Sequence, residues 1–221
     1  MKNLYGKDAE LDERLLKIAA ADDEFESYKN PHAARVAAIA DALARKFDLA
    51  SHDCFSLRQA ALLHDIGVVL MNREYIGAKR SLREEELFDM QRHTVIGEQE
   101  AAKRGFNRAV QLLIRWHHEW WSGVGYPDAL AGEQIPLAAR ILRVADTYAA
   151  MTDERPFRHA ISESESRRRL IEWAGIEFDP QVVKAFLTLE NLAELKSYAG
   201  TQPAREAYVE SSYGSSIFSV S

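Results

Sequence analysis

The stretch ALLHDIG, residues 61–67, places two ionisable side chains at the end of an apolar helical face. His64 continues that face, and Asp65 follows it at once. The spacing predicts a helix over 56–66, and Gly67 is typical of a helix stop. The apolar members of the face are Leu57, Ala60, Ala61 and Leu63. An imidazole and a carboxylate directed at the interior need partners there, because an isolated buried charge is costly.

Helical spacing recurs along most of the chain. The predicted helices cover residues 32–47, 56–66, 84–104, 107–119 and 137–152. Ser162 and Glu165 form a capping box for a further helix that ends at Gly175, and the pair Asp179-Pro180 begins another. The chain shows no convincing two-residue strand period. We therefore predict an all-α fold, a helical bundle with its sites built between helices.

The overall composition and net charge limit the classes of function that the protein can have. The 221 residues are 47% hydrophobic, which suffices for a sizeable core, and the net charge of −6 disfavours binding to a DNA or RNA polymer. An anionic substrate stays compatible, because a bound cation can invert the local field. The lone Cys54 excludes an intrachain disulfide. We find no apolar run of the ~18–20 residues that a membrane span needs, and the polar, acidic N-terminus predicts a cytoplasmic protein without a signal peptide.

Composition divides the chain into three parts. Residues 1–26 read as a charged helical leader, and residues 27–190 as the main domain. Residues 191–221 turn Ser- and Tyr-rich and lose the helical stripe, which predicts a partly mobile tail.

Five predicted helices each direct an imidazole or a carboxylate inward. One inward histidine is usually a hydrogen-bonded core residue, but five such helices favour a shared cation. The seven candidate ligands are His32, His64, Asp65, His93, His117, His118 and Asp146. Seven exceed the needs of one tetrahedral ion, so the count favours two divalent metals, with Asp65 able to bridge them. Iron, manganese and zinc all suit these ligands.

Two further histidines do not join this set. His52 and Asp53 repeat the His-Asp dipeptide, but no apolar stripe leads to them, so we predict a loop in which Asp53 serves a turn or a cap. His159 follows a proline in a basic stretch and reads as a surface residue.

The ordered series of motifs over residues 27–188 resembles the HD superfamily of metal-dependent phosphohydrolases, and within it the HD-GYP branch of bacterial cyclic dinucleotide phosphodiesterases. The stretches that carry the resemblance are HAARV (32–36), ALLHDIG (61–67), HTVIG (93–97), HHE (117–119), GYP (125–127), LAGEQIPLAARI (130–141), VADTYAAMT (144–152), RPFR (155–158) and GIEFDPQVVKAFL (175–187).

The resemblance implies a ligand set for each metal and a wall of substrate-binding residues. One metal would be held by His32, His64, Asp65 and Asp146, and the second by Asp65, His93, His117 and His118. The implied substrate contacts are Tyr126, Arg155 and Arg158. The implied activity is hydrolysis of a cyclic dinucleotide, cyclic di-GMP above all, by a hydroxide that the two metals activate at His64 and Asp65.

The sequence departs from the family pattern at several positions. Val68 replaces the usual Lys after HDIG, and Ala149 replaces a usual Asp. Ser122 and Ala129 replace an Asp and a Gly of the loop, and Tyr28 stands where some members carry a Glu for a third metal. Two rivals follow: an HD phosphohydrolase acting on another nucleotide or phosphoester, and a signalling module that binds metals and cyclic dinucleotide with little turnover. Only about 26 residues precede the domain, so we expect any regulation to come from a separate protein, the tail or oligomerisation, and the sequence does not assign the oligomeric state.

Overall fold

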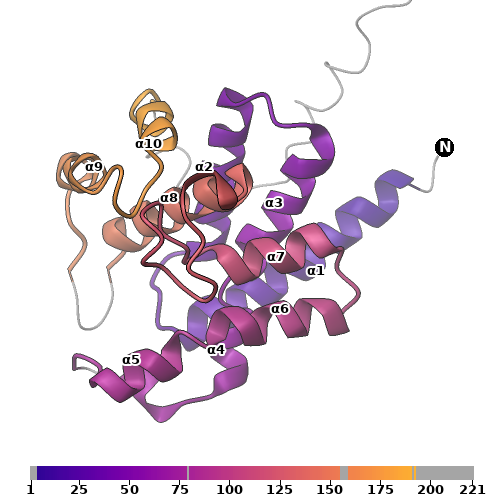
Figure 1. The fold of residues 1–221 in the computed structure, drawn as a ribbon. Helices are drawn as coiled ribbons and strands as arrows, with labels where there is room; N and C mark the ends of the chain where they lie inside the picture. The colour runs from indigo at the N-terminus through magenta and orange to yellow at the C-terminus, as the bar shows by residue number, and fades with distance from the viewer. Residues whose placement is uncertain (1–3, 79, 155–158, 191, 193–221) are drawn as a thin grey trace, which may run out of the picture.

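The computed structural model describes residues 4–78, 80–154, 159–190 and 192, and these are helical almost throughout (Figure 1). The α-helices are α1 (Leu4–Phe25), α2 (His32–Lys46), α3 (Ser51–Leu63), α4 (Ile66–Met71), α5 (Glu84–Met90), α6 (His93–Lys103), α7 (Arg108–Trp116), α8 (Leu137–Thr152), α9 (Glu163–Glu172) and α10 (Pro180–Leu187). Two short 3₁₀ turns, η1 (Glu74–Gly77) and η2 (Gly132–Gln134), join them. The described residues form no β-strand, and the all-α prediction is confirmed.

The core lies where α2, α3 and α8 pack together. α7 covers α3 and pairs with α6, which in turn packs on α4 (Figure 1). α9 and α10 pack on α8 at the end of the molecule away from α5. The largest fully buried apolar side chains come from these helices and include Leu43, Leu57, Leu63, Ile114, Ile141, Leu142, Tyr148 and Phe186. Every helix that carries a candidate metal ligand therefore touches this core or its immediate neighbours.

The first helix is packed onto the rest of the fold. α1 contacts α2, α3 and α4, and its Leu15 and Ala19 are buried. Near its end Asp23 accepts a hydrogen bond from the main-chain amide of Ala33 over 3.2 Å. Asp23 thus satisfies an amide in the first turn of α2, which Pro31 at the cap position leaves without a side-chain partner. The 1–26 segment helps to position His32 at the start of α2.

Several predicted helices end earlier than the apolar stripes indicate. α3 ends at Leu63, a turn carries His64 and Asp65, and Gly67 lies inside α4 instead of stopping a helix. The helix predicted over 84–104 is interrupted at residues 91–92, and the one predicted over 107–119 ends at Trp116. α8 and the capped starts of α9 and α10 match the prediction.

The His52–Asp53 pair does not lie in a loop, as the sequence suggested. Both residues are in the first turn of α3, which begins five residues before the predicted helix. His52 is solvent-exposed and Asp53 is half-buried, and Nε2 of the first lies 3.3 Å from Oδ1 of the second, away from the core. An aspartate in a first turn is stabilised by the helix dipole, which explains Asp53 without a ligand role.

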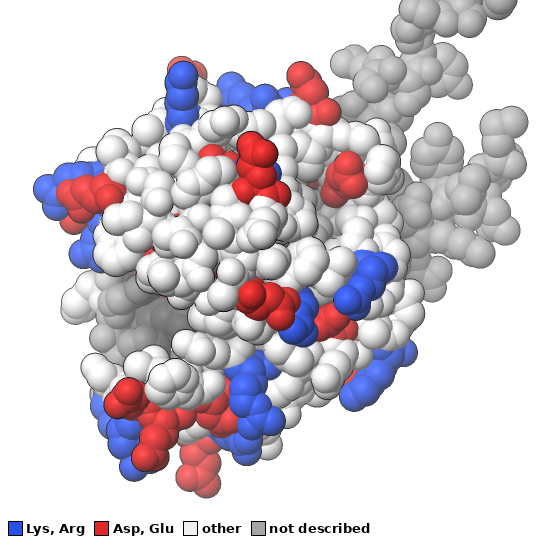
Figure 2. All heavy atoms as spheres, viewed as in Figure 1, with Lys and Arg blue, Asp and Glu red and all other residues white. Residues whose placement is uncertain are grey.

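One stretch, Ser51–Met71, is long and apolar enough by length and composition to cross a membrane. Two thirds of that window are buried inside the protein, and the turn at His64 and Asp65 interrupts it. A core helix passes the same test, so the stretch is weak evidence for a span. On the face shown in Figure 2, basic and acidic side chains are interspersed. That face offers no continuous basic surface for a nucleic-acid polymer.

Gly67 allows α4 to approach α6 closely. A Cβ built on Gly67 would lie 2.0 Å from the main-chain oxygen of His93 and 2.9 Å from the amide of Gly97. Both obstacles are backbone atoms, so no side-chain rotation can make room. The glycine therefore sets the distance between the Asp65 turn and the start of α6.

We expect Gly67→Ala to destabilise the protein by at least about 2 kcal/mol, because the methyl group overpacks the α4–α6 contact. Urea unfolding measures the change. Gly105→Ala is the matched control, since a Cβ there meets nothing within 4 Å and the strain comes only from its positive φ of 80°. A Gly67→Ala protein as stable as the wild type would contradict this packing, because alanine is normally favoured over glycine inside a helix.

Candidate metal centre

Three of the predicted ligands share one local arrangement at a helix end. The Nδ1 atoms of His64, His93 and His117 each lie 2.7–2.9 Å from the main-chain oxygen three residues earlier. These contacts take up carbonyls near helix ends, where the regular ladder leaves some unpaired. Because Nδ1 then carries the proton, each neutral ring has its lone pair on Nε2. All three Nε2 atoms are thereby prepared as metal ligands.

Asp65 lies between these rings and faces two groups of histidines at once. Its Oδ2 is 3.1 Å from Nε2 of His64, while its Oδ1 is 3.5 Å from Nε2 of His93 and 3.8 Å from Nε2 of His117. Asp65 is the first residue after α3 and His64, so the helix break aims the carboxylate across the interior. One carboxylate thus offers one oxygen to each group.

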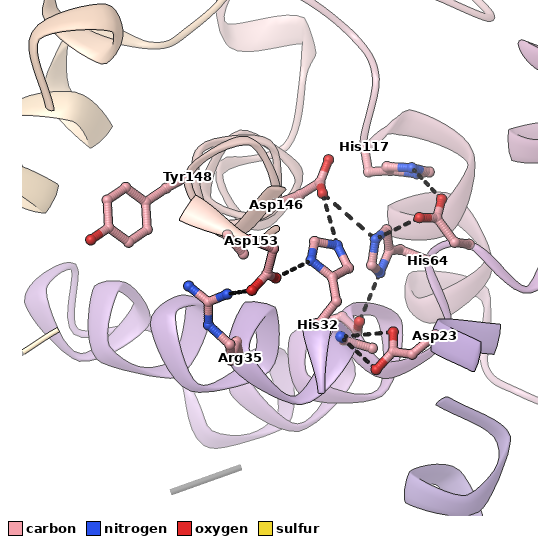
Figure 3. Close-up of polar contacts among 12 residues, drawn as sticks. Asp23, His32, Arg35, His64, His117, Asp146, Tyr148 and Asp153 are labelled. Atoms are coloured by element: carbon pink, nitrogen blue, oxygen red, sulfur yellow. Dashed lines mark hydrogen bonds and ion pairs between the residues drawn. The ribbon is translucent and has the colours of Figure 1, made fainter. Parts of the chain in front are cut away.

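His32 and Asp146 complete the first group (Figure 3). Nε2 of His32 is 3.3 Å from Oδ1 of Asp146, and the same oxygen is 3.8 Å from Nε2 of His64. On its other side, Nδ1 of His32 is 3.4 Å from Asp153, a fully buried carboxylate that is also paired with Arg35. Asp153 therefore stands at ion-pair distance behind the His32 ring, the position that a second carboxylate often takes behind a metal-binding histidine.

The carboxylates draw positive charge into this first group. Burial alone would lower the pKa values of His32 and His64, but the neighbouring Asp65, Asp146 and Asp153 outweigh it and raise them to about 9 and about 10. Against its own burial, Asp146 has its pKa lowered to about 2 by the two histidines. The space between these side chains thus favours a cation.

The second group is nearer to neutral. Burial lowers the pKa of His93 to about 4, with Asp65 only partly opposing the shift. Burial, His117 and Arg143 together hold the pKa of His118 well below its usual range. Neutral imidazoles are the form that binds a transition metal.

The donor atoms fit two divalent cations. Asp65, His93, His117 and His118 place one ligand atom each within 4.8 Å of one another, and so do His32, His64 and Asp65. We call His32, His64 and Asp65 the first cluster, and Asp146 borders it. We call Asp65, His93, His117 and His118 the second cluster. The buried Nε2 atoms of His32 and His64 have no hydrogen-bond partner. Buried nitrogens without hydrogen-bond partners, facing carboxylates, fit a metal better than a hydrogen-bonded core.

The loop after His118 is held by a residue to which the sequence analysis gave no role. Glu119 is buried, and its two oxygens accept from the amides of Asp128 and Leu130 over 2.6 and 2.9 Å. Gly125 lies so close to the main chain that its Cβ would be 2.2 Å from the amide of Trp120. These contacts fold the loop back and stack Tyr126 on His118, with ring centroids 4.8 Å apart.

The structure describes the predicted site residues except for two arginines. The seven predicted ligands come together, and Tyr126 lies beside the second cluster. Arg155 and Arg158 lie outside the described residues. The predicted tail, residues 191–221, also lies outside them except for Leu192. His159 is exposed, as expected. Beyond Glu119, the residues that the sequence analysis missed are Asp23, Arg35, Arg143, Asp153 and Glu177.

Comparison with known families places the chain. The family model described as "HD domain" matches residues 14–182, more than half of the chain. The chain belongs to the HD-domain family. The match begins inside α1. The expected HD-type helical fold and divalent-metal chemistry are thus supported by an independent comparison.

Curated relatives agree with this assignment and with the HD-GYP branch. The chain is 32% identical over 198 residues to a cyclic di-GMP phosphodiesterase response regulator, RpfG, of Xanthomonas campestris, covering 86% of this chain and 52% of that protein. It is 30% identical over 158 residues to a 3'3'-cGAMP-specific phosphodiesterase of Vibrio cholerae, covering 71% of this chain and 30% of that protein. The chain therefore spans about half the length, or less, of these two relatives.

Solved structures share the fold at low identity. A cyclic GMP-AMP phosphodiesterase of Vibrio cholerae, V-cGAP3, aligns with a TM-score of 0.65 at 19% identity, over 89% of this chain and 57% of that one. An HDG"Y"P protein of Bdellovibrio bacteriovorus aligns with a TM-score of 0.58 at 22% identity, over 71% and 50%. At these identities the likeness establishes the helical fold.

We expect Glu119→Gln to destabilise the protein by about 1.5–3 kcal/mol. The main-chain amides of Asp128 and Leu130 lose a charged acceptor, and the NH₂ group of the glutamine side chain faces one of these N–H groups. Thermal unfolding and urea titration measure it. Glu133→Gln, an exposed change on η2, is the matched control and should behave as the wild type. Equal stability of the two variants would show that Glu119 does not hold the loop.

A substitution at Ala129 should raise the stability of the protein instead of lowering it. Its φ of 54° lies in the left-handed region, which is unfavourable for a residue with a Cβ. We expect Ala129→Gly to stabilise the protein by about 1 kcal/mol, although glycine usually destabilises. A lower unfolding midpoint for this variant than for the wild type would refute the strain at this position.

Proposed function

We propose that this protein hydrolyses a phosphodiester bond of a cyclic dinucleotide, with cyclic di-GMP as the first candidate. The observation that carries the proposal is Asp65, whose two oxygens face two separate groups of histidine Nε2 atoms. A carboxylate shared in this way suits a two-metal site for phosphate ester chemistry. The names of the curated relatives supply the substrate class.

Each side chain has a distinct part in this proposal. His32, His64, Asp65 and Asp146 would hold one cation, and Asp65, His93, His117 and His118 the other. When bound, two divalent cations activate water as a nucleophile and neutralise charge on the phosphate. The carbonyl contacts at Nδ1 fix the orientation of three of the rings and turn the Nε2 atom of each toward the centre. His64 and Asp65 lie at the junction of the two clusters, where the reaction would occur.

Charge supports an anionic substrate. The described residues of the two clusters contribute only the carboxylates of Asp65 and Asp146, since Asp153 is paired with Arg35 and Glu177 with Arg143. Two divalent cations would therefore leave the centre net positive. Tyr126, stacked on His118, would form part of the wall beside the phosphate or a base. Arg155 and Arg158 remain proposed phosphate contacts from the sequence.

A metal-binding signalling module with little turnover is the second candidate. It is favoured by Val68 and Ala149, which are both buried, so neither position supplies a charge to the centre. The name of the second relative makes 3'3'-cGAMP the next candidate among the cyclic dinucleotides. An HD phosphohydrolase that acts on another nucleotide or phosphoester is the remaining alternative. The proposed metals are iron or manganese, with zinc as an alternative, and the cytoplasmic location and a separate regulatory protein stay predictions.

The direct test loads the protein with Mn²⁺ or Fe²⁺ and follows cyclic di-GMP and 3'3'-cGAMP by chromatography. We expect hydrolysis that ceases with a chelator and falls at least about a hundredfold in Asp65→Asn, because losing even an outer partner of a metal site costs 10–100-fold. His52→Asn is the matched control, since His52 belongs to the exposed His-Asp dipeptide. Binding of dinucleotide without product by the metal-loaded protein would favour the signalling module.

A further inference from the structure

His118 differs from its neighbours in what its Nδ1 contacts. His93 and His117 turn Nδ1 to a main-chain carbonyl, whereas Nδ1 of His118 lies 2.7 Å from Nη1 of Arg143. A guanidinium only donates hydrogen bonds, so Nδ1 must be the acceptor. The neutral His118 ring therefore carries its proton on Nε2 when Arg143 is in this position.

This contact is incompatible with metal binding by His118. A neutral imidazole binds a metal through the nitrogen that holds its lone pair. If Nδ1 is the ligand atom, Arg143 lies where the cation must approach. If Nε2 is the ligand atom, the proton moves to Nδ1 and confronts the N–H of Arg143. In both cases, ligation by His118 and the hydrogen bond from Arg143 exclude each other.

Arg143 remains beside the centre when it leaves His118. It lies on α8 one turn before Asp146, with Nη1 3.5 Å from Oδ2 of that residue, and Nη2 is paired with Glu177. Its side chain is largely buried, and its Nε–H is buried without a hydrogen-bond partner. Glu177 would therefore retain the guanidinium near the second cluster with free donors.

We propose that a divalent cation at the second cluster displaces Arg143 from His118, and that the released guanidinium binds a phosphate oxygen of the substrate. The planar fork of arginine suits phosphate, and the freed donors supply the contact. The displacement stands on the His118 geometry alone, whereas phosphate binding rests on the proposed function. Metal loading and anion binding then favour each other, as reciprocal linkage requires.

The first experiment titrates metal-free protein with Mn²⁺ by calorimetry, with the two binding steps fitted separately. We expect Arg143→Met to tighten one step at least about tenfold, because the cation no longer breaks a charge-assisted hydrogen bond or meets a nearby positive charge. Arg140→Met is the matched control on the same helix, since Arg140 contacts Asp179 and the carbonyl of Ile135 and not the clusters. If Arg143→Met and Arg140→Met bind Mn²⁺ with wild-type affinity, the displacement is wrong.

The second experiment adds inorganic phosphate to the Mn²⁺-loaded proteins. Arg143→Met should bind phosphate at least about tenfold more weakly than wild type, while Arg140→Met keeps its affinity. Unchanged phosphate affinity alongside tighter Mn²⁺ binding would overturn the proposal that the released guanidinium binds phosphate.

Should Arg143→Met fail to fold, the double variant Arg143→Met/Glu177→Gln is tested in its place, because it also removes the Glu177 carboxylate that the single change leaves unpaired. The remaining outcome is that Arg143→Met binds Mn²⁺ more tightly and phosphate more weakly than the wild type, while the metal-loaded wild type hydrolyses no cyclic dinucleotide. That result would refute the proposed function and leave the displacement of Arg143 standing.

Discussion

The hydrogen bond from an imidazole Nδ1 to the main-chain carbonyl three residues earlier is the constraint on which this structure depends. It occurs at His64, His93 and His117, and each time at or next to a helix end. The bond orients the ring, places the lone pair on Nε2 and takes up a carbonyl near the interruption. At His64 the accompanying turn directs Asp65 into the interior. The ligand orientation and the helix ends thus coincide in the same short segments.

The ligands could be found from the sequence because they lie on or beside apolar helical faces. Burial of His64 or His117 on such a face has a physical cost, so their type and spacing indicate a shared cation. The helix ends could not be found in this way. Ring-to-carbonyl contacts lie beside the interruption after Leu63 and beside that at residues 91–92, and the apolar stripe continues across both.

Partners far apart in the sequence were also missed. Asp153 meets Arg35 across 118 residues, and Arg143 meets His118 across 25. Glu119 stands beside the two histidines, but its role is to bind amides of a loop nine to eleven residues later. Nothing in composition or helical period marks such residues, because their role follows from where the chain returns. Asp23 is similar, since it serves the next helix.

α8 connects the two halves of the centre. It carries Asp146 at the first cluster and Arg143 at the second, three residues apart and therefore on adjacent turns of one face. Both residues lie on this one largely buried helix. A shift of α8 at one cluster would therefore also move the charged side chain at the other cluster. We infer that one framework would hold both the metals and the phosphate, and that the loop that Glu119 folds back would supply the aromatic wall.

We propose that Asp65 joins two metal sites. Diffraction from crystals of the Mn²⁺-loaded protein, recorded at the manganese absorption edge, tests it most directly. We expect two anomalous peaks on opposite sides of the Asp65 carboxylate, one beside His32 and His64 and the other beside His93 and His117. A single peak that does not touch Asp65, or no peak among these residues at saturating metal, would contradict it.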